Sequence, residues 1–262
     1  MSRGAGVAIV TGGARGIGAA TVRRLAADGW AVVAVDRGAD DPRLPYRLGT
    51  AEELAAVVAG SERVVAVSGD AADAAVLAEA VGIAESRFGG LDAMLAVAGV
   101  VAGGVPLWEM PEEQMDAVLE TDLRAVLVAA RVAIPALLRR PEPRQGRFVA
   151  VASAAATRGL PLLAAYCAAK SGVVGLIRAL AVELQDSGIT ANAVSPGSTE
   201  TPILDESGRL YGLASAQKFA PQQTIGRLIT ADEVAGVLVF LAGPGSSAMT
   251  GSVVAVDGGL AL

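Results

Sequence analysis

The chain contains no histidine and a single cysteine, Cys167, among its 262 residues. Without histidine, a Ser-His-Asp triad, an imidazole general base and a histidine-ligated zinc site are all excluded. A single cysteine excludes an internal disulfide bond and a cysteine-rich metal site. Proton transfer must therefore use tyrosine, lysine, aspartate, glutamate or the lone thiol, and no metal is expected.

Clustered basic residues are also missing, and the formal net charge is −6. Binding to phosphate backbones needs clustered Lys and Arg, so nucleic acid is not an expected partner. No uninterrupted apolar run approaches the roughly 20 residues of a membrane span. Residues 1–6 are too few for a signal-peptide n-region. These features predict a soluble cytoplasmic protein without a membrane partner.

Aromatic residues make up only 3% of the chain, whereas hydrophobic residues make up 53%. Short Val- and Ile-rich runs alternate with longer Ala- and Leu-rich segments of helical period. Strands are predicted at residues 7–11, 31–36, 64–69, 93–97, 146–152, 190–195 and 253–257. Helices are predicted at residues 16–28, 72–88, 112–138, 165–185 and 231–242. This alternation predicts an α/β fold of the doubly wound, Rossmann type: a seven-stranded parallel sheet with helices on both faces, in one domain spanning residues 1–262.

Two segments interrupt this alternation. Residues 38–60 contain several prolines and a capping-box pattern, Thr50 to Glu53, that predicts a short helix. Residues 199–228 show no strand pattern and contain Tyr211 and Phe219, two of the few aromatic residues. We interpret residues 199–228 as a lid over a substrate site, and the alternative is a helical excursion on the surface.

A glycine-rich loop from Thr11 to Gly18 follows the first predicted strand and opens the first helix. Glycines let the backbone turn sharply and approach a pyrophosphate, which the helix N-terminus attracts. Asp36 ends the next strand, and a carboxylate there binds the ribose hydroxyls and repels a 2′-phosphate. The pattern therefore favours NAD over NADP. Arg15 and Arg37 would weaken this preference if either placed its charge near the 2′ position.

Tyr166 and Lys170 are four residues apart in a predicted helix and therefore share one of its faces. A free tyrosine has a pKa near 10, and a desolvated ammonium a few ångströms away stabilises the phenolate by about 4 kcal/mol. Ser153 ends the fifth predicted strand, where its hydroxyl is able to hold a substrate oxygen. Such tyrosine–lysine pairs are common on helix surfaces, so the prediction of a catalytic site depends on the serine and the glycine loop as well.

Together these motifs resemble the classical short-chain dehydrogenase/reductase family over nearly all of the chain. Other matching positions are Asn192, Thr201 and the closing Asp257-Gly258-Gly259. The resemblance implies that Tyr166 is the acid/base, that Lys170 holds the nicotinamide ribose and lowers the pKa of Tyr166, and that Ser153 orients the carbonyl. It also implies a homotetramer built through the long helices. The cofactor-binding residues that it implies are Gly12, Arg15, Gly16, Ile17, Gly18, Asp36, Arg37, Asp70, Ala71, Val97, Ala98, Gly99, Tyr166, Lys170, Pro196, Gly197, Thr199 and Thr201.

The chain departs from the family pattern at two places. The usual Asn-Asn-Ala-Gly after the fourth strand is Ala96-Val97-Ala98-Gly99 here, so the amides that brace neighbouring strands are missing. The fourth catalytic residue of the family is an asparagine that holds a water in a proton relay, and Asp122 aligns with it. An ionised Asp122 would stabilise the Lys170 ammonium and offset its effect on Tyr166. We expect a relay that survives with an altered pH profile.

Residues 39–46, 163–170 and 196–199 look similar to a finer branch, the mycofactocin-associated enzymes. That resemblance implies a tightly held NAD, covered in part by residues 38–60, and a peptide-derived redox carrier as electron partner. The main prediction is an NAD-dependent oxidoreductase that acts on a secondary alcohol or ketone in a largely apolar small molecule. The alternatives are a ketoreductase of acyl-chain or natural-product biosynthesis and a non-catalytic dinucleotide-binding protein.

Overall fold

The computed structural model describes residues 6–262, so the expectation about the N-terminal segment falls largely outside the described residues. The strands are β1 (Val7–Thr11), β2 (Ala31–Asp36), β3 (Val64–Ser68), β4 (Ala93–Ala96), β5 (Gly146–Val151), β6 (Ile189–Pro196) and β7 (Val253–Val256). The helices are α1 (Gly16–Ala27), α2 (Ala51–Val58), α3 (Ala74–Phe88), α4 (Glu112–Leu119), α5 (Ala125–Leu138), α6 (Ala164–Glu183), α7 (Pro202–Leu210) and α8 (Ala231–Ala242). Short 3₁₀ turns lie at Leu107–Glu109, Ala154–Ala156, Ala216–Gln222 and Pro244–Ser246.

All strands of the described chain form one parallel sheet in the order β3-β2-β1-β4-β5-β6-β7. The predicted α/β fold with seven parallel strands is confirmed. Every residue of β1 and of β5 is buried, which explains why these strands are apolar without alternation. The direction of the strand order reverses between β1 and β4, and ligands of such sheets bind beside this point, at the carboxyl ends of the strands.

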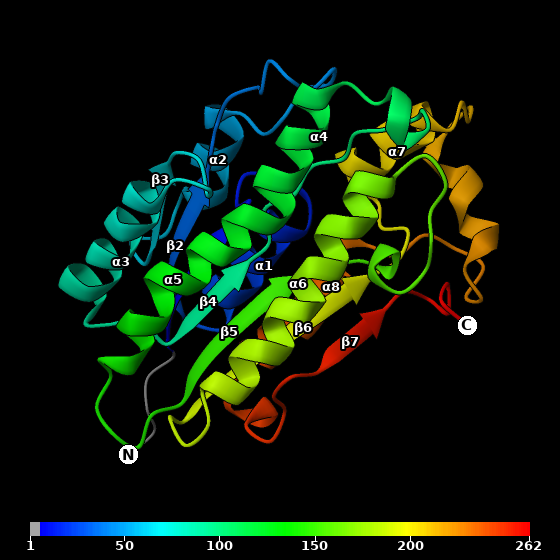
Figure 1. Cartoon of the computed structure of the whole chain (residues 1–262). Helices are drawn as coiled ribbons and strands as arrows, with labels where there is room; N and C mark the ends of the chain where they lie inside the picture. Colours follow the sequence, from blue (N-terminus) through cyan, green and yellow to red (C-terminus); the bar gives the residue numbers. More distant parts are fainter. Residues whose placement is uncertain (1–5) are drawn as a thin grey trace.

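Helices cover both faces of the sheet (Figure 1). On one face α3, α5 and α6 pack into a core that contains Leu77, Ala133 and Ile177. On the other face α1, α2 and α8 pack into a second core that contains Leu25, Leu54 and Leu238. The many alanines of these helices let them approach the sheet closely, so a core with few aromatic rings is still filled.

The helix predicted over residues 112–138 is interrupted, which is the largest difference from the sequence-based prediction. Between α4 and α5 the backbone forms a π-helical turn at Glu120–Arg124. A π turn adds one residue to the helical repeat and commonly marks a functional site. Here the turn contains Asp122, whose side chain is completely buried.

Helix α6 is long enough and apolar enough to cross a membrane by length and composition alone. In the fold it lies against the sheet, with Ala169, Lys170, Val173 and Ile177 buried. Its apolar face is therefore that of a core helix.

Candidate active site and cofactor cleft

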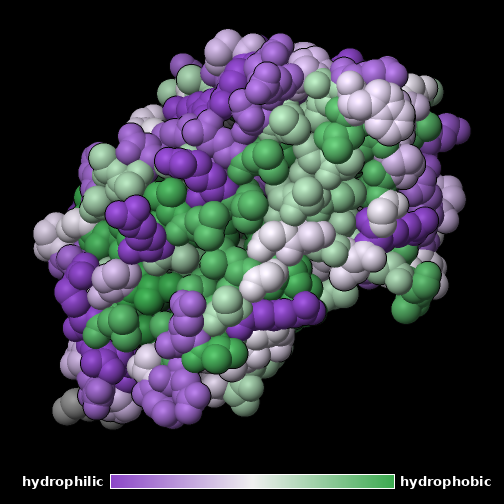
Figure 2. All heavy atoms as spheres, in the orientation of Figure 1, coloured by the Kyte–Doolittle hydropathy of each residue, from purple (hydrophilic) through white to green (hydrophobic). Residues whose placement is uncertain are grey.

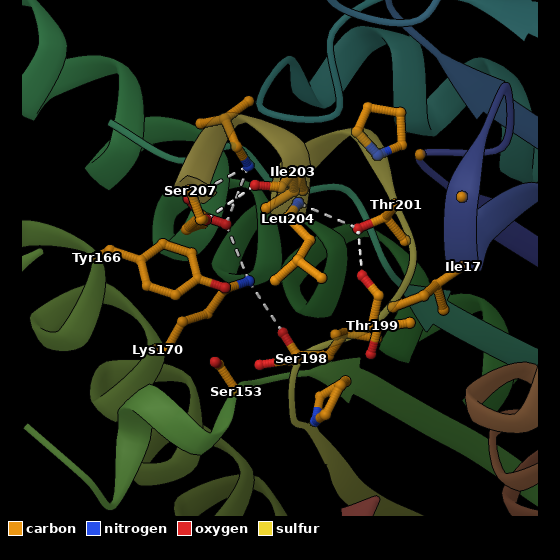
Figure 3. A pocket seen from close by; sticks show the side chains of 18 of the residues that line it. Ile17, Ser153, Tyr166, Lys170, Ser198, Thr199, Thr201, Ile203, Leu204 and Ser207 are labelled. Carbon is orange, nitrogen blue, oxygen red and sulfur yellow. Dashed lines mark hydrogen bonds and ion pairs between the residues drawn. The ribbon is translucent and has the colours of Figure 1, made fainter. Parts of the chain in front are cut away.

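The carboxyl ends of the central strands open into a cavity of about 640 Å³. Every residue predicted from the sequence to bind the cofactor or to act in catalysis lines this cavity. Figure 3 shows Tyr166, Lys170 and Ser153 on one side, with Thr199 and Thr201 from the segment after β6 on the other. Positions as distant in the sequence as Gly12 and Thr201 thus meet at one edge of the sheet.

The glycine loop approaches its neighbours too closely for side chains. A Cβ at Gly18 would lie 1.9 Å from the carbonyl oxygen of Gly12, and a Cβ at Gly12 would lie 2.8 Å from Cα of Ala98. Gly12 also has a φ of +70°, which favours glycine. Helix α1 begins directly after this loop at Gly16, so its N–H groups face the cavity as a diphosphate site requires.

The Asp36 carboxylate lies at the edge of this loop. It accepts hydrogen bonds from the backbone N–H groups of Ala14, at 3.0 Å, and Gly38, at 3.2 Å. Gly49 passes so close that a Cβ there would lie 3.1 Å from the Asp36 carboxylate. The carboxylate is therefore fixed in place at the cavity wall, where the sequence predicts the ribose hydroxyls of NAD.

Thr11 braces the ends of β1 and β4, where the family's usual asparagines are absent. Its hydroxyl oxygen accepts hydrogen bonds from the backbone N–H groups of Val97, at 3.0 Å, and Ala98, at 3.2 Å. The end of β1 is thereby joined to the chain leaving β4. A hydroxyl on β1 thus braces the chain leaving β4, although the family's usual amides are absent there.

Tyr166 and Lys170 project from α6 toward Ser153, which follows β5. The Lys170 ammonium lies 5.7 Å from the centre of the Tyr166 ring and donates a hydrogen bond of 3.1 Å to the carbonyl oxygen of Val151. A hydrogen bond from Ser153 favours the Tyr166 phenolate. The fold therefore brings the Ser153 hydroxyl, the Tyr166 phenol and the Lys170 ammonium together at the floor of the cavity.

Known proteins share this arrangement over almost the whole chain. The family model described as enoyl-(acyl carrier protein) reductase matches residues 12–261. The chain is 37% identical over 256 residues to the short-chain reductase protein NovJ of Streptomyces niveus, which covers 97% of this chain and 93% of that protein. The chain belongs to the short-chain dehydrogenase/reductase family.

Two further relatives indicate the chemistry. Cis-4-hydroxycyclohexanecarboxylate dehydrogenase of Sinomonas cyclohexanicum is 37% identical over 257 residues, which are 97% of this chain and 95% of that protein. The crystal structure of carveol dehydrogenase from Mycobacterium avium in complex with NAD superposes with a TM-score of 0.90 at 29% identity, covering 98% of this chain and 99% of that one. This member of the family is an NAD(H)-dependent oxidoreductase that acts on CH–OH groups.

The pKa of the Tyr166 hydroxyl is raised overall. Burial, the largest cause, raises this pKa, Lys170 lowers it, Asp122 raises it and Ser153 lowers it. The effects of Lys170 and Asp122 have the directions that the sequence implied, but burial was not anticipated from the sequence and outweighs Lys170. The physical reason is that the cavity floor desolvates the phenolate and that Asp122 neutralises much of the lysine charge.

Asp122 forms a buried ion pair with Lys170, with Oδ1 2.9 Å from Nζ. The same carboxylate accepts hydrogen bonds from the backbone N–H of Val100, at 3.3 and 3.4 Å. Burial raises the pKa of the Asp122 carboxyl group, against the effects of Lys170 and the Val100 N–H. Burial lowers the pKa of Lys170, but Asp122 and Tyr166 outweigh burial and the net pKa is raised. Lys170 therefore keeps its proton.

The outer wall of the cavity differs in part from the prediction. From the composition of residues 99–110 a wall of the substrate pocket is expected, but of that segment Gly99 and Val100 line the cavity while Trp108 is 84% exposed. Sequence reasoning missed Leu260, near the C-terminus, which carries no motif, so only the fold reveals that it faces the site. Leu48 and Gly49 also line the cavity, and they belong to residues 38–60, which the finer resemblance expected to cover the cofactor.

Proposed function

We propose that this enzyme interconverts a secondary alcohol and a ketone in a largely apolar small molecule, with Tyr166 as the acid/base. The observation that carries the proposal is the convergence of Tyr166, Ser153 and Lys170 beside an apolar wall. The apolar residues of that wall are Leu160, Leu163, Leu213, Phe219 and Leu260. A highly charged substrate would lose hydration against this wall without gaining polar partners.

The residues present fit an NAD molecule. The glycine loop leaves space where side chains would clash, and the N-terminus of α1 faces that space. When bound, the nicotinamide ring supplies or accepts the hydride. In the oxidation direction Ser153 holds the substrate oxygen while the Tyr166 phenolate takes the hydroxyl proton. Lys170 stabilises that phenolate, and the positive charge of the NAD⁺ ring favours it further.

Substitution Tyr166→Phe tests the assignment. It removes the proton acceptor and keeps the ring, so kcat should fall by about a factor of 10² to 10⁴. NADH binding should weaken by no more than about tenfold, the loss of one hydrogen bond to the dinucleotide. A variant that keeps most of the wild-type turnover would refute the role of Tyr166.

The relatives suggest which substrates to screen first. Their names describe dehydrogenases of a hydroxycyclohexane carboxylate and of carveol, and we propose that alicyclic secondary alcohols are substrates here. Arg158 lines the cavity and donates a hydrogen bond of 2.6 Å to the carbonyl oxygen of Leu260. A screen should pair each neutral alcohol with its carboxylate-bearing analogue, and Arg158→Gln shows whether a preference for the anion depends on this residue.

Residues 199–228 are proposed as the substrate lid. Thr201 caps α7, and Tyr211 at the end of α7 donates a hydrogen bond of 2.7 Å to the carbonyl oxygen of Pro161. The rings of Tyr211 and Phe219 meet edge to face with centres 6.0 Å apart. These contacts join the lid to the loop that follows Ser153, so substrate size should be selected between them.

We also propose that NAD is held tightly and that the electron acceptor is a separate redox carrier, of the mycofactocin type. Support comes from the segment between Asp36 and α2, residues 37–50, which we call the strap. The Tyr46 hydroxyl accepts a hydrogen bond of 3.0 Å from the Val101 N–H, and Arg15 donates one of 2.9 Å to the Arg47 carbonyl oxygen. The strap is thus tied at Arg15 to the glycine loop and at Val101 to the chain that follows β4, as a cover over the cofactor would be.

Absorbance and fluorescence of the purified protein before and after denaturation test whether NAD is retained, since retained NAD(H) should be released in stoichiometric amount. An empty protein would favour an exchangeable cofactor.

The assembly proposed is a cytoplasmic homotetramer. In Figure 2 apolar side chains gather over α5 and α6. Leu127 is 46% exposed on α5, and α6 presents small residues to the exterior, including Ala168, Gly175 and Ala179. Small residues let two helices approach closely, and a second copy would bury this face. Sedimentation velocity would show the predicted tetramer or a smaller species.

A further inference from the structure

The strap contains a buried carboxylate, Asp41, that is only 2% exposed. It accepts hydrogen bonds from Arg43, with 3.0 Å to Nε, 2.8 Å to Nη2 and 3.0 Å to the backbone N–H. It also accepts one of 2.6 Å from Nη1 of Arg37. The hydrogen bond from the Arg43 side chain lowers the pKa of the Asp41 carboxyl group, and the Arg43 backbone N–H and Arg37 lower it further. Burial raises this pKa, but the donors outweigh burial and hold it well below its usual range. Asp41 is thus an anion at neutral pH.

Arg37 directly follows Asp36 and lines the cofactor end of the cavity. One outer nitrogen of its guanidinium group donates to Asp41 and the other pairs with Asp70. Burial lowers the pKa of Arg37, yet the two carboxylates more than compensate and the net pKa is raised. The Arg37 side chain is 25% exposed and borders the cleft, but both outer nitrogens of its guanidinium group already have carboxylate partners.

An Arg37 side chain without carboxylate partners would favour NADP(H) over NAD(H). A guanidinium group binds phosphate with two parallel hydrogen bonds, and the 2′-phosphate of NADP(H) distinguishes it from NAD(H). Arg37 is adjacent to the carboxylate predicted to bind the ribose, so it is the natural ligand for that phosphate. With Asp41 and Asp70 on its two outer nitrogens, its charge is neutralised and its fork is already occupied.

We propose that Asp41 is a positioning residue that sets cofactor selectivity: it holds Arg37 in an ion-paired orientation, so that Asp36 faces the ribose without a competing cation. Selectivity for NAD(H) then depends on residues 36, 37 and 41 together. Arg43 continues the network to the π turn through a contact of 2.8 Å with Glu120. The strap therefore fixes the orientation of Asp41 as well as covering the cofactor.

The test measures dissociation constants for NADH and NADPH by titration of the full-length protein, stripped of nucleotide, and so needs no substrate. Asp41→Asn keeps the shape of the side chain and removes its charge. NADPH should bind about tenfold more tightly or better, because Arg37 becomes available, while NADH affinity stays within about threefold. If this variant does not fold, Asp41→Ser retains an acceptor for the Arg43 N–H and carries the same expectation.

Two controls separate selectivity from loosening of the strap. In the double variant Asp41→Asn with Arg37→Gln, NADPH should bind no better than in Arg37→Gln alone, because the gain requires the guanidinium. Tyr46→Phe loosens the strap at Val101 but touches neither Arg37 nor Asp41, so the ratio of the two affinities should match wild type. The proposal is overturned if Asp41→Asn leaves that ratio unchanged, or if its gain persists when Arg37 is replaced.

Discussion

Asp122 and Lys170 form an ion pair of 2.9 Å in which neither side chain is more than 3% exposed. The π turn between α4 and α5 carries this carboxylate to the ammonium, which also lies 5.7 Å from the centre of the Tyr166 ring. A buried pair of this kind holds its two partners in one arrangement, and removal of either partner leaves an uncompensated buried charge. The charge that reaches Tyr166 is that of the pair and not of the lysine alone.

Replacement of Asp122 by asparagine should shift the pH profile toward acid. Asp122 raises the pKa of Tyr166, so its removal lowers that pKa. The rate of alcohol oxidation rises with pH as Tyr166 ionises, and this limb should therefore move to lower pH. The profile of kcat/KM against pH for Asp122→Asn and wild type measures the shift. Superimposable profiles would mean that Asp122 has no influence on the phenol.

Substitution of Gly18 should abolish dinucleotide binding. A Cβ at Gly18 would lie 1.9 Å from a backbone oxygen, so Gly18→Ala must displace the glycine loop and costs about 1–3 kcal/mol of stability. NADH affinity should fall at least about a hundredfold, equivalent to about 3 kcal/mol. Gly82→Ala is the matched control, because a Cβ at Gly82 in α3 meets nothing within 4 Å of the described atoms. That variant should bind NADH normally and gain about 0.5–1 kcal/mol.

Removal of the Tyr46 hydroxyl should speed the release of NADH. Tyr46→Phe leaves the Val101 N–H without its acceptor, at a cost of about 1–3 kcal/mol for a buried donor. The strap would then open more often, and the dissociation rate of NADH in stopped flow should rise about tenfold, with little change in kcat for the chemical step. Equal dissociation rates in the two proteins would show that the strap does not retain the cofactor.

Asp41 should stabilise the fold in a pH-dependent way. Its pKa in the folded protein lies below the unfolded value, so its contribution is complete above about pH 4 and is lost as pH falls through the folded pKa. At pH 7 the variant Asp41→Asn should be less stable than wild type by about 2 kcal/mol, from lost hydrogen bonds to charged groups. The difference should shrink at pH 3. Guanidinium unfolding at both pH values measures it, and a difference that does not depend on pH would contradict the assignment.

The fold could be predicted because its determinants are local. Continuous runs such as Val7–Thr11 belong only to strands buried on both faces, and their alternation with helices requires a parallel sheet. The glycine loop and the spacing of Tyr166 and Lys170 are equally local, since each depends on residues within one turn or one strand end. The residues that line the cofactor cleft could be predicted as well, because the carboxyl ends of parallel strands meet at one edge of the sheet.

The electrostatics of the site could not be predicted from sequence, because they depend on which distant charges the fold brings together. The sequence indicated that Asp122 would act on Lys170 but not that both groups would be fully buried, and it gave no partner for Arg37. The strap and the segment after β3 bring Asp41 and Asp70 to Arg37. Burial, which is set by the whole tertiary structure, then decides the sign of the Tyr166 pKa shift. The sequence by itself determined which groups are available for chemistry, whereas the tertiary structure decided their charge state, because Coulomb interactions and desolvation depend on distance and burial and not on order along the chain.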